Sequence, residues 1–151
     1  MTMDVIRSDR PQWVAFNRRL AVRTSPRKLH DLSEMIHGVV AESFVREGLC
    51  TVYVPHTSAS LVIQENADPD VLGDLGRFMA TLVPESGRYA HSSEGPDDMP
   101  AHIRAALTQT SLGIPVLEGR LALGVWQAVY LWEHRAAAYE RTVIVNLIGT
   151  G

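Results

Sequence analysis

The sequence has a single cysteine and no long apolar run, and each of these absences removes a class of protein. Because Cys50 is the only cysteine, an internal disulfide and a CxxC metal-binding knuckle are both excluded. No stretch approaches the roughly 20 consecutive apolar residues of a membrane-spanning helix, and residues 1–11 lack the apolar core of a secretion signal. We therefore expect a cytoplasmic protein without a membrane partner, in which any metal is held by histidine and carboxylate groups.

The chain also lacks a block of charge of one sign. Its 14 Lys and Arg residues are interspersed with 17 Asp and Glu residues, for a formal net charge of -3. This balance argues against nucleic acid as a partner, because nucleic-acid binding requires a basic surface. There is no glycine-rich phosphate loop, and the chain is too short for a TIM barrel of about 250 residues. Two common scaffolds of phosphate chemistry are therefore excluded.

What the chain does have is the size and apolar content of one compact domain. Its 151 residues are 46% hydrophobic and 21% charged, which is the usual balance of a globular protein. No linker, repeat or low-complexity tract divides it. We predict a single domain over residues 1–151, in which residues 1–11 form a flexible N-terminal extension.

Hydrophobic periodicity predicts two or three helices in an α+β fold. Helical spacing of apolar residues predicts a helix over residues 32–44, followed by Gly48 as its left-handed C-terminal residue. A second helix is expected to begin at Asp68-Pro69, because an acid followed by proline is a helix start signal. Pro100 can begin a third, shorter helix.

Alternating and β-branched segments predict several antiparallel strands. The predicted strands are residues 12–23, 49–54, 60–64, 116–123, 125–132 and 142–148. We expect the strands at 116–123 and 125–132 to pair, because only Gly124 separates them. Loops are predicted over residues 85–99, which are rich in acids, glycine and proline, and over residues 135–140, which are too few for an independent helix.

Three polar clusters lie at the ends of these predicted elements. They are His56-Thr57-Ser58, the segment from His91 to His102 with Asp97 and Asp98, and Trp126-Gln127 leading to Glu133-His134-Arg135. Side chains at element ends can converge on one pocket while rigid elements hold them in place. Three histidines, His56, His91 and His102, suit zinc or a related divalent ion, although their spacing is not that of the HExxH motif.

The same residue types also have ordinary structural roles, which stay open from the sequence alone. Each histidine can be a hydrogen-bonded residue without chemistry, and Asp97 and Asp98 can cap the helix that follows them. Cys50 lies in an apolar strand and is expected to be an inert buried thiol. Four arginines can either bind phosphate or form ordinary ion pairs, namely Arg88, Arg104, Arg135 and Arg141.

Four motifs occur together and in order, and their combination resembles the YjbQ family. They are HTSASL at 56–61, QENADPDV at 64–71, GPDDMPAHI at 95–103 and GVWQAVYLWEHR at 124–135. The resemblance implies a β-sandwich-like core of mostly antiparallel strands, assembly as a homotrimer, and a weak thiamine-phosphate synthase activity. That reaction joins a hydroxymethylpyrimidine diphosphate to a thiazole phosphate. Departures from the family pattern at Val125, Ala128 and the C-terminus remove no candidate ligand or base.

Carried over residue by residue, the resemblance marks the candidate site. The catalytic candidates are His56, His91, Asp97, Asp98 and His102. The candidates for contact with a small phosphorylated metabolite are Ser58, Asn66, Gln127, Glu133 and Arg135. His56, His91 and His102 are the candidate ligands of a divalent metal, zinc or magnesium. Two other functions stay open, which are a non-catalytic protein that binds a phosphorylated metabolite or serves assembly, and a metal-assisted hydrolase of a small metabolite.

Overall fold

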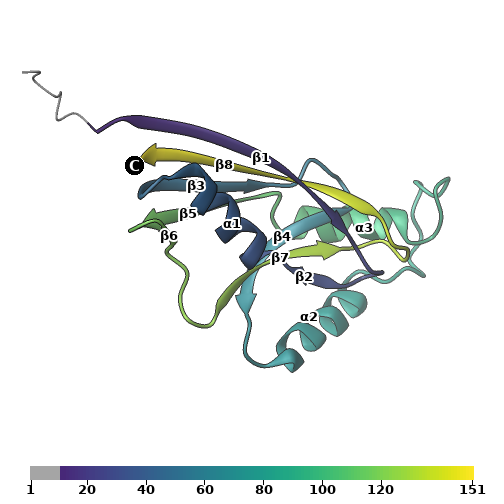
Figure 1. Ribbon diagram of the computed structural model, residues 1–151. Helices are drawn as coiled ribbons and strands as arrows, with labels where there is room; N and C mark the ends of the chain where they lie inside the picture. The colour runs from purple at the N-terminus through teal and green to yellow at the C-terminus, as the bar shows by residue number, and fades with distance from the viewer. Residues whose placement is uncertain (1–10) are drawn as a thin grey trace, which may run out of the picture.

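Two antiparallel β-sheets and three helices make up the protein (Figure 1). The structure, a computed structural model, describes residues 11–151, so the predicted extension over residues 1–11 lies almost wholly outside the described residues. One sheet contains, in spatial order, β1 (Trp13–Arg23), β8 (Glu140–Thr150), β3 (Glu47–Tyr53), β5 (Ser111–Leu117) and β6 (Arg120–Leu121). The other contains β2 (Leu29–Asp31), β7 (Gln127–Glu133) and β4 (Ala59–Glu65). The helices are α1 (Ser33–Ser43), α2 (Pro69–Leu82) and α3 (Asp98–Leu107).

The hydrophobic core lies between the two sheets. Val143, Val145 and Leu147 alternate along β8 and are fully buried, as the two-residue period of a half-buried strand requires. Leu61 of β4 and Leu131 of β7 come from the other sheet and belong to the same apolar cluster. The predicted α+β fold with mostly antiparallel strands is therefore confirmed.

Helix α1 closes one side of this core, where it contacts β1, β6 and β8 of one sheet and β7 of the other. Its buried face is formed by Ile36, Val39 and Val40, at the helical spacing seen in the sequence. The helix ends at Ser43 and is capped by Phe44, which has a left-handed φ of 58°. Gly48 lies within β3 instead. The prediction that Gly48 ends this helix was wrong, because a phenylalanine adopts the left-handed conformation four residues earlier.

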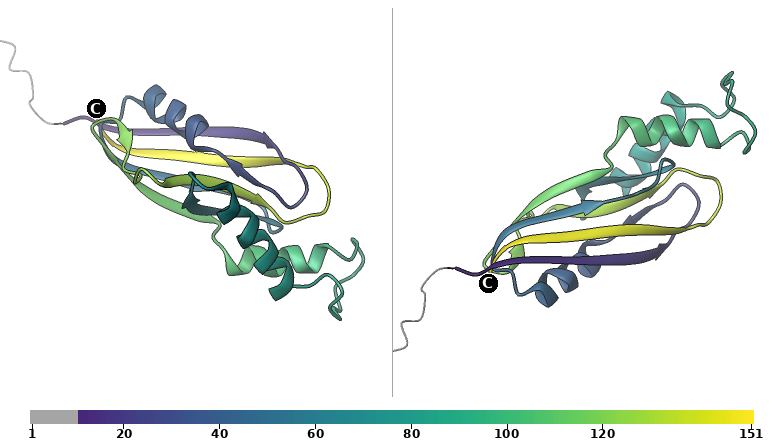
Figure 2. Two further views of the ribbon diagram at one scale, coloured as in Figure 1. Left: turned by 90° about the horizontal axis from the view of Figure 1, so that it is seen from below. Right: turned by 90° about the horizontal axis from the view of Figure 1, so that it is seen from above.

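Helices α2 and α3 lie together at one end of the molecule, beside the three-stranded sheet (Figures 1 and 2). Asp68 caps α2 as predicted, with its carboxylate accepting a hydrogen bond from the backbone N–H of Asp70 at 2.9 Å. No residue of α2 is buried. By contrast, α3 buries Ala101 and Ala105 and begins at Asp98, two residues before the predicted start at Pro100. Among residues 11–151, no helix combines the length and apolarity needed to span a membrane.

The predicted pairing of segments 116–123 and 125–132 is wrong. In the structure β5 pairs with β3 and β6, whereas β7 pairs with β2 and β4 in the other sheet. The chain crosses from one sheet to the other between these strands, at the turn that contains Gly124. The prediction failed because segments that are adjacent in the sequence belong to different sheets, which pack on opposite sides of one core. The three-residue strand β2 was not predicted, because so short a strand has no readable period.

Gly48 allows a close approach of β3 and β8, where it pairs with Gly149. A Cβ atom on Gly48 would lie 2.2 Å from the carbonyl oxygen of Ile148. We therefore predict that Gly48→Ala lowers the free energy of unfolding, measured by urea denaturation, by about 2 kcal/mol or more. The matched control is Gly113→Ala in β5, whose Cβ would meet nothing closer than 3.8 Å and should change stability by about 0.5 kcal/mol at most. Equal losses in both variants would contradict the close approach.

Candidate metal site

A buried carboxylate at the start of α3 gathers two histidines. Asp98 is 2% exposed, and its Oδ2 lies 2.7 Å from His91 Nε2 and 3.2 Å from His102 Nε2. His102 is four residues further along α3, so it lies on the same helix face as Asp98. His91 comes from the loop before the helix, and the two imidazole rings are 5.5 Å apart between centroids. Two of the predicted histidines therefore do converge, on an acid that the sequence also marked.

The position of the hydrogen on the His102 ring determines whether His102 Nε2 can donate a hydrogen bond to Asp98. His102 Nδ1 lies 3.1 Å from the backbone carbonyl oxygen of Thr57. A carbonyl only accepts, so Nδ1 must carry the hydrogen, and Nε2 of the neutral imidazole is left with a lone pair. That lone pair would face a carboxylate oxygen of Asp98 at 3.2 Å. Two acceptors repel each other, so the contact needs a cation, which is either a second proton on His102 or a metal ion.

The three groups have the composition of a zinc site. One ligand atom from each of His91, Asp98 and His102 lies within 4.8 Å of the other two. Zinc is commonly held by imidazole nitrogen and carboxylate oxygen, and three protein ligands leave a fourth position open for chemistry. The predicted set contained His56 in place of Asp98. In the structure, His56 lies outside this group, and its Nε2 accepts a hydrogen bond from the backbone N–H of Thr142 at 2.9 Å.

Arg135 contacts the second carboxylate oxygen of Asp98. Its Nη1 lies 2.9 Å from Asp98 Oδ1, and its Nε donates to Asp97 Oδ2 at 2.9 Å. A third contact runs from Nη2 to the backbone carbonyl of Glu94 at 3.0 Å. Asp97 Oδ2 also accepts from the backbone N–H of Ala136 at 2.8 Å, so it makes no side-chain cap to α3. These contacts give Arg135 a positioning role, because all three of its guanidinium nitrogens are engaged within the protein.

The electrostatic surroundings keep both acids in the charged form. Burial alone would raise the pKa of Asp98, but the hydrogen bond from His91 and the charges of Arg135 and His102 outweigh burial, and the net pKa lies below its usual value. The hydrogen bond from Arg135 lowers the pKa of Asp97 in the same way. Asp98 is therefore a carboxylate at neutral pH, which is the form that binds a cation.

A second buried network supports the site from inside the sandwich. Glu133 is fully buried and pairs with Arg141, at 2.6 Å between Oε1 and Nη2 and 2.7 Å between Oε2 and Nε. Thr24 Oγ1 donates to Glu133 at 2.7 Å, and Ser58 Oγ accepts from Arg141 at 3.0 Å. We call His91, Asp98 and His102 the metal group. The backbone N–H of Arg135 donates to Glu133 Oε1 at 3.1 Å, and the guanidinium of Arg135 contacts Asp98, so Arg135 links this network to the metal group. Two predicted substrate contacts, Ser58 and Glu133, thus lie in a buried structural network.

A shallow pocket of about 300 Å³ adjoins the metal group. It is lined by His56, Thr57, His102, Ala105, Ala106 and Thr110. Burial, followed by the charge of Arg141, lowers the pKa of His56, so its imidazole is neutral at neutral pH. Because Nε2 of His56 accepts the hydrogen bond from Thr142, its hydrogen lies on Nδ1. His56 can therefore act as a hydrogen-bond donor beside the site.

Asn66 and Gln127 lie far from this group within one chain. Gln127 pairs with Glu65 at one end of the β4–β7 ladder, whereas Glu133 pairs with Ala59 at the other end. Six residues of strand separate the ends by about 20 Å, at about 3.4 Å per residue. The backbone N–H of Asn66 donates to the carbonyl of Trp126 at 3.1 Å, and Gln127 Oε1 accepts from the backbone N–H of Gly124 at 2.8 Å. A single chain therefore does not bring these two predicted residues to the histidines.

One contributor was not predicted from the sequence. This contributor is the carbonyl of Thr57, which belongs to the backbone, so the amino-acid type at position 57 does not indicate its role. The spacing of Asp98 and His102, four residues apart after a helix start signal, was a readable sign that both face one way. A further polar residue, His134, is buried with its Nε2 2.7 Å from Ser60 Oγ. Burial, followed by the charge of Arg104, lowers the pKa of His134 to about 3, so it remains a neutral structural histidine.

Comparison with known proteins places the chain in a family. The family described as UPF0047 protein YjbQ-like matches residues 18–150. The chain belongs to the UPF0047/YjbQ family. A UPF0047 protein of Synechocystis is 60% identical over 131 residues, which cover 86% of this chain and 89% of that protein. The YjbQ protein of Escherichia coli O157:H7 is 39% identical over 135 residues, covering 89% of this chain and 98% of the relative.

Solved structures of UPF0047/YjbQ proteins have the same fold. A family member from Clostridium acetobutylicum, described as an uncharacterized conserved protein, superposes with a TM-score of 0.81 at 35% identity, covering 86% of this chain and 98% of that one. A protein of unknown function from Sulfolobus solfataricus gives a TM-score of 0.85 at 24% identity over 91% of this chain and 99% of that one, and supports the fold alone. The names of these UPF0047/YjbQ relatives state no activity.

The geometry of the metal group predicts which residues zinc binding needs. In calorimetric titration of EDTA-treated protein with zinc, we expect one site, and we expect His102→Ala and Asp98→Asn to weaken binding by about 100-fold or more, because each removes a ligand. Affinity should also fall as the pH is lowered, since protons compete for the imidazoles. His56→Ala serves as the control and should bind zinc as the wild type does. A loss of affinity in His56→Ala as large as that in His102→Ala would show that the ligands are assigned wrongly.

Proposed function

We propose that this UPF0047/YjbQ protein is a zinc-dependent enzyme that acts on a small phosphorylated metabolite in the cytoplasm. The observation that carries the proposal is the convergence of His91 and His102 on the buried carboxylate of Asp98, where the contact between His102 Nε2 and Asp98 Oδ2 needs a proton or a metal ion between two acceptors. Zinc fits better than magnesium, because two of the three donors are imidazole nitrogens and magnesium prefers oxygen. The pocket beside His102 supplies a place for the metabolite.

The reaction we propose is the one that the family resemblance implies, a weak synthesis of thiamine phosphate. The bond between the pyrimidine methylene carbon and the diphosphate oxygen breaks, a bond from the thiazole nitrogen to that carbon forms, and pyrophosphate leaves with the electron pair. A site for this reaction must stabilise the negative charge that develops on the pyrophosphate. A bound divalent ion would supply that stabilisation as a Lewis acid. His56 lines the same pocket, and its Nδ1–H is a donor for a phosphate oxygen.

The shape of the site is consistent with a weak activity. The pocket next to the metal group is open and has a volume of about 300 Å³, which is at the small end of the range for small-molecule sites. Two substrates must lie there in line for the reaction. Two candidate contacts, Asn66 and Gln127, lie at the far end of the β4–β7 ladder. Within one chain the substrates would therefore be held by few groups.

The same ligands favour one alternative, a metal-assisted hydrolase. Three protein ligands with an open fourth position are the arrangement of hydrolytic zinc sites, and the group of His91, Asp98 and His102 offers three. A hydrolase needs only one substrate in the pocket. A protein that binds metal and phosphorylated metabolites without turnover is the non-catalytic alternative. Assays with one substrate and with both substrates separate these functions.

We predict that zinc-loaded protein releases pyrophosphate and forms thiamine phosphate only when both substrates are present. His102→Ala should lower the rate by about 100-fold or more, because it removes a metal ligand. The matched control is His37→Ala, a histidine exposed on α1 away from the site, whose rate should equal that of the wild type. Phosphate release from a single substrate would favour the hydrolase. Equal rates in the wild type, His102→Ala and His37→Ala would exclude the proposed site.

We further propose that the protein assembles as a homotrimer. The outer face of the five-stranded sheet exposes large apolar side chains, and in residues 11–151 no helix crosses this face (Figure 2, right). These side chains are Trp13, Leu49, Tyr53, Leu117 and Ile148. Extended apolar surface on a small protein marks an interaction site. A neighbouring chain could also bring its Asn66 and Gln127 to the metal group, which one chain does not.

The assembly is tested by light scattering coupled to size-exclusion chromatography. We expect the mass of three chains for the wild type and of one chain for Ile148→Lys, because a charge at the centre of an apolar contact is costly to bury. The control is Met35→Lys, an exposed apolar position on α1 that lies off the sheet face. A wild-type monomer, or a trimer of Ile148→Lys, would contradict the proposed interface.

A further inference from the structure

A buried arginine on the other side of α3 lacks the partners that its charge requires. Arg104 follows His102 by two residues, so it points about 200° away around the helix. It is 5% exposed, and its Nη2 donates to the backbone carbonyl of Val83 at 2.7 Å. Its Nε is buried and has no hydrogen-bond partner in the part of the chain that the structure describes. Within residues 11–151, none of the ion pairs includes Arg104.

A guanidinium in this position is costly for the protein. Burial removes the water that stabilises the charge, and one neutral carbonyl does not replace it. The same burial lowers the pKa of Arg104, although Glu85 partly offsets this effect. Apolar side chains of similar volume fill such positions at no such cost. A buried guanidinium in this position therefore points to a group that it binds.

The space around Arg104 has room for that group. A small cavity of about 40 Å³ adjoins an open one of about 340 Å³, and Arg27, Ala80 and Arg104 line both. The small cavity is also lined by Gly76 and Met79 of α2 and by Trp132, Glu133 and His134 at the end of β7. The open cavity is large enough for a small metabolite, and it leads from solvent to the buried guanidinium.

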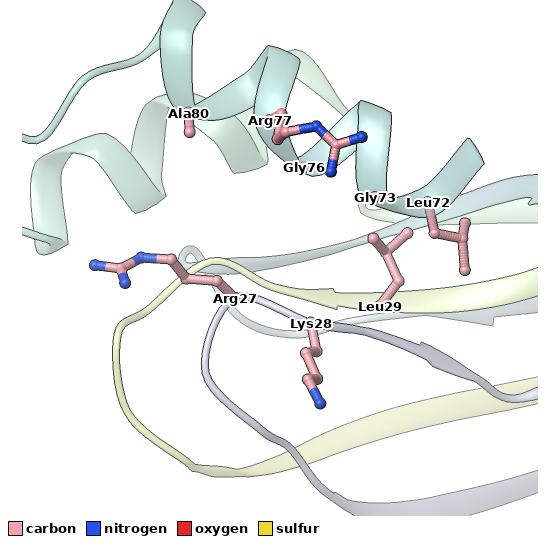
Figure 3. Close-up of a pocket in the computed structure, with 8 residues that line it drawn as sticks. All are labelled: Arg27, Lys28, Leu29, Leu72, Gly73, Gly76, Arg77 and Ala80. Atoms are coloured by element: carbon pink, nitrogen blue, oxygen red, sulfur yellow. The ribbon is translucent and has the colours of Figure 1, made fainter. Parts of the chain in front are cut away.

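Arg27 supplies a second positive charge to the same space. It lies in the turn before β2 and lines a further groove of about 440 Å³ beneath α2. Figure 3 shows its side chain running along this groove toward the Ala80 end of the helix, whereas Lys28 points away from the helix. Arg27 has a left-handed φ of 54°, which is unfavourable for a residue with a side chain and is often found at functional positions.

The charge in this space is not balanced by the protein. Glu85 pairs with Arg27 and is the one acid that lines the open cavity. Glu133 lines the small cavity, but its charge is already balanced by Arg141. Two arginines and one glutamate leave a net positive charge there. Two guanidinium groups facing one space are the usual arrangement for binding a phosphate or carboxylate, because each can donate two parallel hydrogen bonds.

We propose that the space between α2, α3 and the three-stranded sheet binds a small oxyanion, the phosphate or carboxylate group of a metabolite, through Arg104 and Arg27. The anion accepts hydrogen bonds from the guanidinium of Arg104 and competes with Glu85 for Arg27. This oxyanion site faces away from the metal group on the other side of α3, so it goes beyond the proposed function and does not depend on it. Bound oxyanion would also fix the packing of α2, which has no buried residue of its own.

The site is tested with inorganic phosphate as the probe. Calorimetric titration of EDTA-treated wild-type protein should show saturable phosphate binding, and Arg104→Met should lose about tenfold or more in affinity. Because Arg104→Met removes an unpaired buried charge and keeps similar volume, its melting temperature without phosphate should equal or exceed that of the wild type. Phosphate should then raise the melting temperature of the wild type but not that of the variant.

Two further variants separate the oxyanion site from the metal group. Glu85→Gln should bind phosphate several-fold more tightly, because it removes the carboxylate that competes for Arg27. His91→Ala should bind phosphate as the wild type does, even if its zinc affinity is lost. Absence of saturable phosphate binding to the wild type, or equal affinity in the wild type and Arg104→Met, would overturn the proposal. Loss of phosphate binding in His91→Ala would assign the anion to the metal group instead.

Discussion

The contact between a carbonyl, an imidazole and a carboxylate determines the chemistry of this structure. The Thr57 carbonyl places the hydrogen of His102 on Nδ1, so the Nε2 lone pair faces Asp98. A carboxylate and a lone pair tolerate each other at that distance only with a cation between them. His91 approaches the same carboxylate oxygen and supplies a second imidazole nitrogen. A second proton on His102 or a metal ion meets this requirement, and the third donor on the same carboxylate is what favours the metal ion in our proposal.

The sandwich holds these groups in place through buried charge. The ion pair of Glu133 and Arg141 fills the end of the core where apolar side chains stop. Arg135 follows two residues after Glu133 in the chain, is hydrogen-bonded to it, and reaches Asp97 and Asp98. The end of one strand thereby orients the first turn of α3. Such supporting contacts fix ligand geometry and are as important to a metal site as the ligands themselves.

Much of the fold and part of the site could be predicted from the sequence, and the failures have physical causes. The helices α1 and α2 and the long strands β1 and β8 have clear periodicity, so their positions were predicted. The partners of β5 and β7 were not, because pairing between two sheets depends on contacts across the core. The motifs marked Asp98 and His102, but whether His56 or Asp98 completes the metal group depends on the path of the loop before α3. The burial of Arg104 depends likewise on how α2 and α3 pack, which no local pattern encodes.

The most direct test of the central claim is an anomalous diffraction map at the zinc edge, from crystals of the protein grown with zinc. The account predicts one peak at about 2.0–2.1 Å from the Nε2 atoms of His91 and His102 and at about 2.0–2.2 Å from a carboxylate oxygen of Asp98. The Nδ1 atom of His102 should stay within hydrogen-bond distance of the Thr57 carbonyl. A peak at His56, or no peak between the three groups at saturating zinc, would contradict it.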